Sequence, residues 1–98
     1  MQVRFDPDAL SELAGAMDWY MARSAAAGRA FAMAIERTVA RLREHPLRWP
    51  PYLHGTRRAR LRRFPFALIY RVGADEIQLV AVVHLHRRPG YWRNRPSE

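Results

Sequence analysis

The sequence contains no cysteine, no lysine and no long apolar run. Without cysteine the chain can form neither a disulfide nor a thiolate metal site, which is compatible with a reducing compartment. No apolar stretch approaches the roughly 20 residues of a membrane-spanning helix, and the N-terminus lacks the basic and then apolar pattern of a signal peptide. We therefore expect a soluble, cytoplasmic protein that does not contact a membrane.

All 17 basic residues are arginines, and the formal net charge is +8. Residues 1–56 contain seven arginines and six acidic residues, whereas residues 57–98 contain ten arginines and three acidic residues. Codon bias in a GC-rich genome can explain the preference for arginine, but not its uneven placement. A basic half of this kind is typical of a surface that binds a polyanion or an acidic partner protein.

The length and composition indicate a single globular domain, residues 1–98. A chain of this size buries roughly 65% of its unfolded surface. With 49% hydrophobic and 27% charged residues, it is too apolar to be disordered.

The first half predicts one short strand and two helices. Gln2–Phe5 alternates polar and apolar residues, and Asp6 followed by Pro7 predicts the start of a helix. Apolar residues then recur at steps of three and four, so we expect an amphipathic helix with one face in the core. The members of this stripe are Leu10, Leu13, Ala14, Met17, Tyr20 and Met21.

A second helix is expected after a turn at residues 23–28, with Ser24 as its cap. Pro46 ends this helix near Glu44. Its core face contains Phe31, Ile35, Val39 and Leu42. The two helices should form an antiparallel hairpin.

From residue 57 the period changes to two, which predicts three strands separated by turns at Phe64-Pro65 and Gly73–Asp75. The last strand, residues 77–83, is apolar on both faces, so it is either central or covered by a partner on its second face. The expected class is α+β in the order β-α-α-β-β-β, with the helical hairpin packed on one face of a small antiparallel sheet.

Basic and aromatic residues gather where the last strand ends. Guanidinium groups make paired hydrogen bonds to phosphate or carboxylate, so we expect a concave basic surface on the sheet face opposite the helices. The residues expected to contact a target are Arg58, Arg60, Arg62, His84, His86, Arg87, Arg88, Tyr91 and Trp92. The alternative is that arginines on a solvent-facing strand only keep the sheet edge soluble.

No metal or cofactor is expected. His84 and His86 lack neighbouring acidic or thiol ligands, and no phosphate-binding loop, dinucleotide fingerprint or nucleophile elbow is present. Metal-free cleavage of RNA is chemically conceivable, since it needs a base, an acid and cations on the phosphate. The candidate catalytic residues for that reaction are Arg60, His84, His86 and Tyr91.

The order of these motifs resembles the RelE/ParE superfamily of toxins from bacterial type II toxin–antitoxin modules, and within it the ParE branch. The resemblance covers nearly the whole chain, and its most specific parts are Phe64-Pro65-Phe66 and the segment from His84 to Trp92. It implies a growth-inhibiting toxin that is neutralised by a cognate antitoxin. For ParE-like members the implied target is DNA gyrase, whereas RelE-like members cut messenger RNA in the ribosomal A site.

Two departures favour the gyrase reading, in which no residue is catalytic. The lysine-dependent form of the RelE-like reaction is excluded, and a Glu-Arg-His-Tyr form lacks its glutamate in residues 57–70, although Arg60, His84 and Tyr91 remain plausible. The alternatives are a ribosome-dependent mRNA endoribonuclease and a non-toxic binding domain of the same fold. We expect the antitoxin to contact Val80, Val82 and Arg71.

Overall fold

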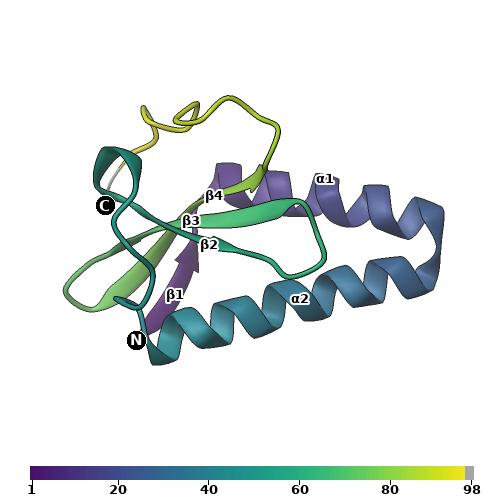
Figure 1. The fold of residues 1–98 in the computed structure, drawn as a ribbon, viewed down its shortest axis with the longest axis horizontal. Helices are drawn as coiled ribbons and strands as arrows, with labels where there is room; N and C mark the ends of the chain where they lie inside the picture. Colours follow the sequence, from purple (N-terminus) through teal and green to yellow (C-terminus); the bar gives the residue numbers. More distant parts are fainter. Residues whose placement is uncertain (97–98) are drawn as a thin grey trace.

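The computed structural model describes residues 1–96, which form a helical hairpin packed on a sheet (Figure 1). The elements are β1 (Gln2–Phe5), α1 (Pro7–Arg23), α2 (Ala25–Glu44), the short 3-10 helix η1 (Leu53–Gly55), β2 (Arg57–Arg60), β3 (Phe66–Val72) and β4 (Glu76–His84). The α+β class and the order of helices and strands are as expected from the sequence.

The sheet has the strand order β1-β4-β3-β2. Strands β2, β3 and β4 form the expected antiparallel meander. β1 pairs with β4 in parallel, with Val3 opposite Ile77, so the sheet is mixed rather than wholly antiparallel. β4 therefore lies between two strands, and its residues from Ile77 to Val83 are all buried. This interior position explains why the strand is apolar on both faces.

The helical hairpin is fixed by one cap and one close approach. Ser24 accepts a hydrogen bond at its Oγ from the backbone N–H of Ala27 at 2.9 Å, which confirms it as the cap of α2. A Cβ added at Gly28 would lie 1.9 Å from Met21 Sδ and 3.3 Å from Met21 Cα. Glycine is therefore what allows α2 to pass so close to the end of α1.

The main core lies between the helices and the sheet. Its centre is aromatic: Phe31 stacks on Tyr20 at 4.8 Å between ring centroids and meets the edges of Phe64 and Phe66 at 5.3 and 5.4 Å. The buried members of this main core are Ala9, Ala16, Phe31, Ile35, Leu42, Ala59, Leu61, Leu68, Tyr70, Ile77, Leu79 and Val82. The expected core face of α2 is confirmed.

The expected core face of α1 is only partly correct. Leu10 is 51% exposed and Met21 is 49% exposed, although both were expected in the core. α1 instead turns Ala9 and Ala16 toward the sheet, because these small side chains allow its backbone to approach β4 closely. One consequence is an apolar stripe on the outer side of α1, since Leu10, Ala14 and Met21 recur at helical spacing and are all exposed.

The loop between α2 and β2 lies on the domain, as its aromatic residues predict. Trp49 packs against the main core, and Tyr70 donates a hydrogen bond from its hydroxyl to the Pro46 carbonyl at 2.7 Å. Arg57 donates to the Trp49 carbonyl. The loop is therefore tied to β2 and β3.

Candidate functional site

The chain continues beyond β4 as a segment without helix or strand, residues 85–96 (Figure 1). Its Trp92 packs on the face of the sheet opposite the main core. Trp92 is 2% exposed and forms the centre of a second buried cluster. The other buried members of this cluster are Ala67, Ile69, Val80, Ala81 and Val83. The basic surface expected on this face is therefore not open across the sheet, because Trp92 of the C-terminal segment packs on it.

A β-bulge in β4 separates two residues that were expected to share an outer face. Ile69 pairs with Ala81 and Tyr70 pairs with Leu79, so Val80 is an extra residue in the ladder. Val80 belongs to the cluster under the C-terminal segment, whereas Val82 belongs to the main core. The antitoxin contact expected at Val80 and Val82 meets no exposed surface there, since the two residues are 0% and 2% exposed.

Glu12 of α1 holds the C-terminal segment in place. Its Oε1 accepts from the Val82 N–H at 3.0 Å, its Oε2 accepts from the Tyr91 hydroxyl, and Arg95 donates to both oxygens at 2.9 and 3.1 Å. Arg95 also donates to the Val80 carbonyl at 2.8 Å. Because β1 ends opposite Leu79, these two side chains take over the hydrogen bonds that a longer β1 would have made to β4.

The same contacts shift the pKa values of Tyr91 and Arg95. Burial raises the pKa of Tyr91, and the hydrogen bond to Glu12 and the charge of Glu12 raise it further. Burial by itself lowers the pKa of Arg95, but the hydrogen bonds and charge of Glu12 outweigh it and the net shift is upward. Tyr91 is therefore a neutral hydrogen-bond donor and Arg95 a fixed cation at physiological pH.

A small basic hollow lies between the C-terminal segment and β2. It has a volume of about 40 Å³, and Arg58, Arg87 and Arg88 line it together with His84 and Tyr91. Two of its guanidinium groups rest on aromatic rings, because Arg58 lies 4.5 Å from the Tyr52 ring centroid and Arg87 lies 4.1 Å from that of Tyr91. The rings hold these two cations at the rim of the space. We call this space the tail hollow.

The remaining predicted contact residues are distributed around this hollow. Arg60 lies beside Arg58 on β2 and lines a neighbouring depression with Trp49. His86 is exposed, and its backbone N–H donates to His84 Nδ1 at 3.1 Å. Arg62 is turned away toward α2, because β2 ends at Arg60 and the alternation stops there. Trp92 is buried and packs instead of facing a partner.

Arg71 lies on the tail-covered face beside Gln78 in the sheet register. Gln78 donates from its Nε2 to Asp6 at 2.8 Å and to the Pro96 carbonyl at 2.8 Å. Asp6 thus begins α1 without capping it and pairs with the sheet instead. Arg71 Nη1 is buried and meets no hydrogen-bond acceptor among residues 1–96. The face of the sheet around Arg71 and Gln78 is therefore polar.

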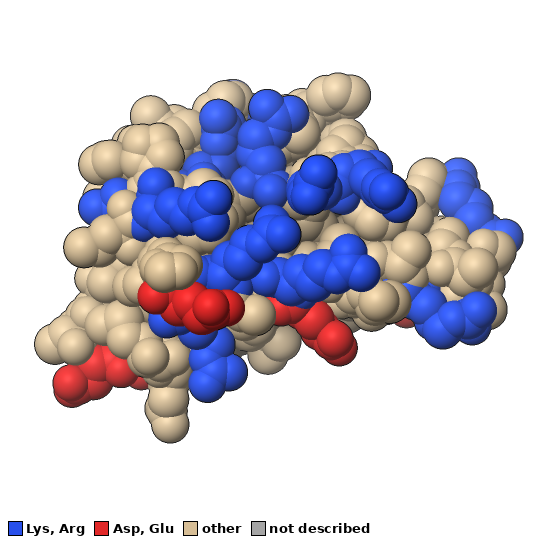
Figure 2. Space-filling view, turned by 60° about the horizontal axis from the view of Figure 1, so that its bottom comes forward, with Lys and Arg blue, Asp and Glu red and all other residues tan. Residues whose placement is uncertain are grey.

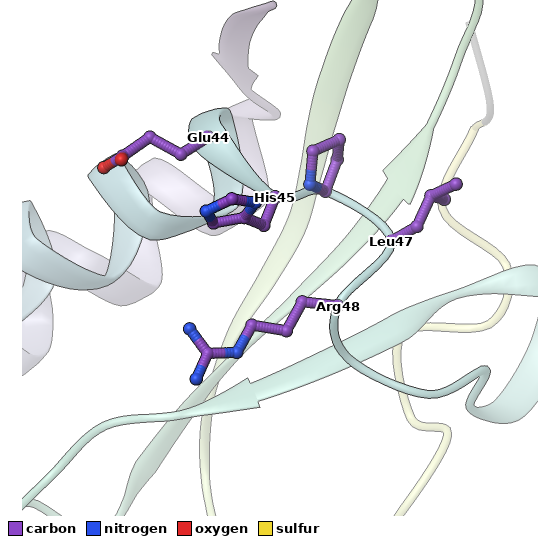
Figure 3. A pocket seen from close by; sticks show the side chains of 5 residues that line it. Glu44, His45, Leu47 and Arg48 are labelled. Carbon is purple, nitrogen blue, oxygen red and sulfur yellow. The ribbon is translucent and has the colours of Figure 1, made fainter.

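Another depression lies at the end of α2 (Figure 3). It has a volume of about 580 Å³ and is lined by residues 44–48. Figure 3 shows His45 and Arg48 extended to one side and Leu47 to the other, so the side chains do not converge on one point. Within residues 1–96, no three acidic or histidine residues meet as metal ligands would, and no helix has the length and apolarity to span a membrane.

The sequence predictions overlooked Glu12 and Arg95. One feature of the sequence could have indicated Glu12. It is a carboxylate directly before Leu13, which packs against the main core, and it is itself only partly exposed. A carboxylate at such a place needs a charged or hydrogen-bonding partner. The partner could not be identified, because Arg95 is 83 residues away in the chain.

A model of the family described as "ParE toxin of type II toxin-antitoxin system, parDE" matches residues 3–89. Among solved structures, a chain titled "Chromosomal ParDE TA system from P. aeruginosa" has a similar fold, with a TM-score of 0.62. Its sequence is 21% identical, and the match covers 86% of this chain and 95% of that chain. No curated protein sequence matches this one. The family match includes Glu12 and the tail-hollow arginines but ends before Tyr91.

Proposed function

Because the chain belongs to the family of ParE toxins of type II toxin–antitoxin systems, we propose that it inhibits bacterial growth by binding DNA gyrase. The observation that carries this proposal is the tail hollow, where Arg58 and Arg87 are held on aromatic rings beside Arg88. Arginines and aromatic residues dominate the binding energy of protein interfaces, and a guanidinium that is already held in place loses less entropy on binding. The exposed guanidinium groups of Arg87 and Arg88 fit carboxylates on a protein target.

The position of Tyr91 argues against the ribonuclease alternative. Its hydroxyl is bound to Glu12, and burial raises its pKa, so it is poorly placed to take or give a proton on a substrate. Arg60 lines a different depression from the one that His84 and Tyr91 share. The residues required for cleavage therefore do not meet around one phosphate.

We further propose that a cognate antitoxin neutralises the toxin by covering the outer stripe of α1. Leu10 and Met21 are each about half exposed there, and an apolar stripe at helical spacing suits a helix-in-groove or helix-on-helix contact. Antitoxin contact at Val80 would require the C-terminal segment to leave the sheet, and contact at Val82 would require the main core to open. Replacing Leu10 and Met21 together with glutamate should abolish complex formation in gel filtration with the antitoxin encoded beside the toxin. Unchanged co-elution would contradict this location.

Controlled expression in a bacterium tests the target. The wild-type protein should cause filamentation and an SOS response, whereas cut transcripts with stalled translation would support the ribonuclease alternative. The R87A/R88A variant should need at least about tenfold more expression for the same growth defect, since each interface arginine contributes on the order of 1–2 kcal/mol. R29A/R43A removes the same charge from exposed positions on α2 and should remain as toxic as the wild type.

A further inference from the structure

A second basic hollow lies between α2 and the connection from β2 to β3. Its volume is about 420 Å³, against about 40 Å³ for the tail hollow. Arg37 and Arg41 line it from α2, and Arg62 and Arg63 line it from the connection. Its other lining residues are Ala30, Met33, Ala34, Thr38 and Phe64. Figure 2 shows this side of the molecule, with arginine side chains gathered across its centre and the visible carboxylates below them.

The charges in this hollow are not balanced within the protein. All four arginines are exposed, and no carboxylate among residues 1–96 lies within 4.0 Å of their guanidinium groups. Arg37 and Arg41 are one helical turn apart, where like charges repel by a few tenths of a kcal/mol. Four unpaired guanidinium groups around one space create a strong positive potential that favours an anion.

The backbone supports this arrangement at an energetic cost. Arg63 has a φ of 71°, in the left-handed region that non-glycine residues avoid at about 1 kcal/mol or more. Arg63 lies in the connection that follows the end of β2 at Arg60, and Arg62 and Arg63 of this connection line the hollow together with α2. The connection is therefore shaped in a way that gathers arginines rather than separating them.

We propose that this hollow binds a strand of nucleic acid, with its phosphates on the four arginines and a sugar or base against Met33 and Phe64. Arginine makes paired hydrogen bonds to phosphate oxygens, and single strands bind proteins through basic grooves with an adjacent aromatic or apolar surface. Along α2 the apolar lining residues Ala30, Met33 and Ala34 come first, and Arg37 and Arg41 come after them, so the arginines lie at one end of the apolar part and not on both sides of it. An acidic amphipathic helix would need charges on both sides of an apolar seam, so this order favours a nucleotide-like ligand with separate phosphate and apolar parts.

The test measures binding of the purified full-length protein to a fluorescently labelled 12-nucleotide single-stranded DNA over a series of salt concentrations. Four phosphate contacts predict a slope of log affinity against log salt of about −2.8, because each contact to a single strand contributes about −0.7. R37Q/R41Q removes two contacts and should reduce the slope to about −1.4, which is about a 25-fold loss of affinity at 0.1 M salt. Glutamine keeps the helix propensity at these exposed positions.

The matched control is R29Q/R43Q, which removes two exposed arginines of the same helix that do not line the hollow. This control should lose at most about threefold in affinity. Equal losses of affinity in the two variants would show that only the total charge of the protein matters, and would overturn the site. An unchanged affinity of R37Q/R41Q would also overturn it. Tighter binding of a glutamate-rich 12-residue peptide that displaces the DNA would also overturn it, in favour of an acidic protein. The experiment contains no gyrase, so its result is independent of the proposed toxin target.

Discussion

Replacing Glu12 with alanine should release the C-terminal segment and destabilise the whole domain. The Glu12 and Arg95 side chains are only 19% and 17% exposed, so the substitution leaves a mostly buried guanidinium without its carboxylate. It also removes the acceptor of the Tyr91 hydroxyl and of the Val82 N–H. Breaking a buried ion pair costs about 3–5 kcal/mol. Arg95 keeps its hydrogen bond to the Val80 carbonyl in this variant. We therefore expect a loss of stability at the lower end of that range, about 3 kcal/mol.

Urea unfolding and thermal melting monitored by circular dichroism measure this loss. For a domain of this size, about 3 kcal/mol corresponds to a melting temperature lower by about 12 °C or more. The matched control is Glu36→Ala, which removes an exposed glutamate from α2 and should change stability by less than about 0.5 kcal/mol. The E12A/R95M double variant should cost less than the sum of the single variants by at least about 1 kcal/mol. A loss below about 1 kcal/mol for Glu12→Ala, or full additivity, would refute the anchoring role.

Three further outcomes follow from the same contacts. Folded Tyr91 keeps its proton above about pH 10, whereas the unfolded chain releases it. The free energy of unfolding should therefore fall above that pH by up to about 1.4 kcal/mol per pH unit. Urea titrations at pH 9 and 11 should show a shallower fall for Y91F. Gly28→Ala should lower the free energy of unfolding by about 1 kcal/mol, because the new methyl group clashes with Met21. Gly15→Ala has open space around it and should raise the free energy of unfolding by up to about 1 kcal/mol. A change of the same sign in both variants would contradict the close approach of the two helices. Ser24→Ala should lose about 1 kcal/mol on removal of the α2 cap, as chemical denaturation will measure, and an unchanged midpoint would show that the cap is dispensable.

The secondary structure was largely predictable because it depends on local patterns. The three- and four-residue spacing fixed α2 with its core face, and the two-residue alternation fixed the meander. The side of α1 that faces the sheet was less predictable. The hydrophobic pattern alone predicts that Leu10 is buried in preference to Ala9. Close packing of α1 against β4 instead favours the smaller side chain at the contact, so Ala9 is buried and Leu10 is exposed.

The arrangement of the site was harder to predict, because it depends on contacts between distant segments. The path of the C-terminal segment depends on the Glu12–Arg95 pair, and no local pattern in the sequence links these residues. The bulge at Val80 reverses the face on which Val82 lies, and it leaves no signal in a uniformly apolar strand. Arg62 was misplaced because β2 ends at Arg60, so the two-residue alternation does not extend to it. Arg58, Arg87 and Arg88, which were expected from the density of arginines, do line one hollow, and their contact with a target stays a prediction.

The account depends most on the claim that the arginines of the C-terminal segment act on DNA gyrase. The direct measurement is the amount of cleaved plasmid that accumulates when purified gyrase, ATP and supercoiled DNA are incubated with the purified protein. The account predicts that the wild type and R29A/R43A cause linear DNA to accumulate, and that R87A/R88A needs at least about tenfold more protein to do so. Absence of cleaved DNA with the folded wild-type protein, or equal activity of R87A/R88A, would contradict it.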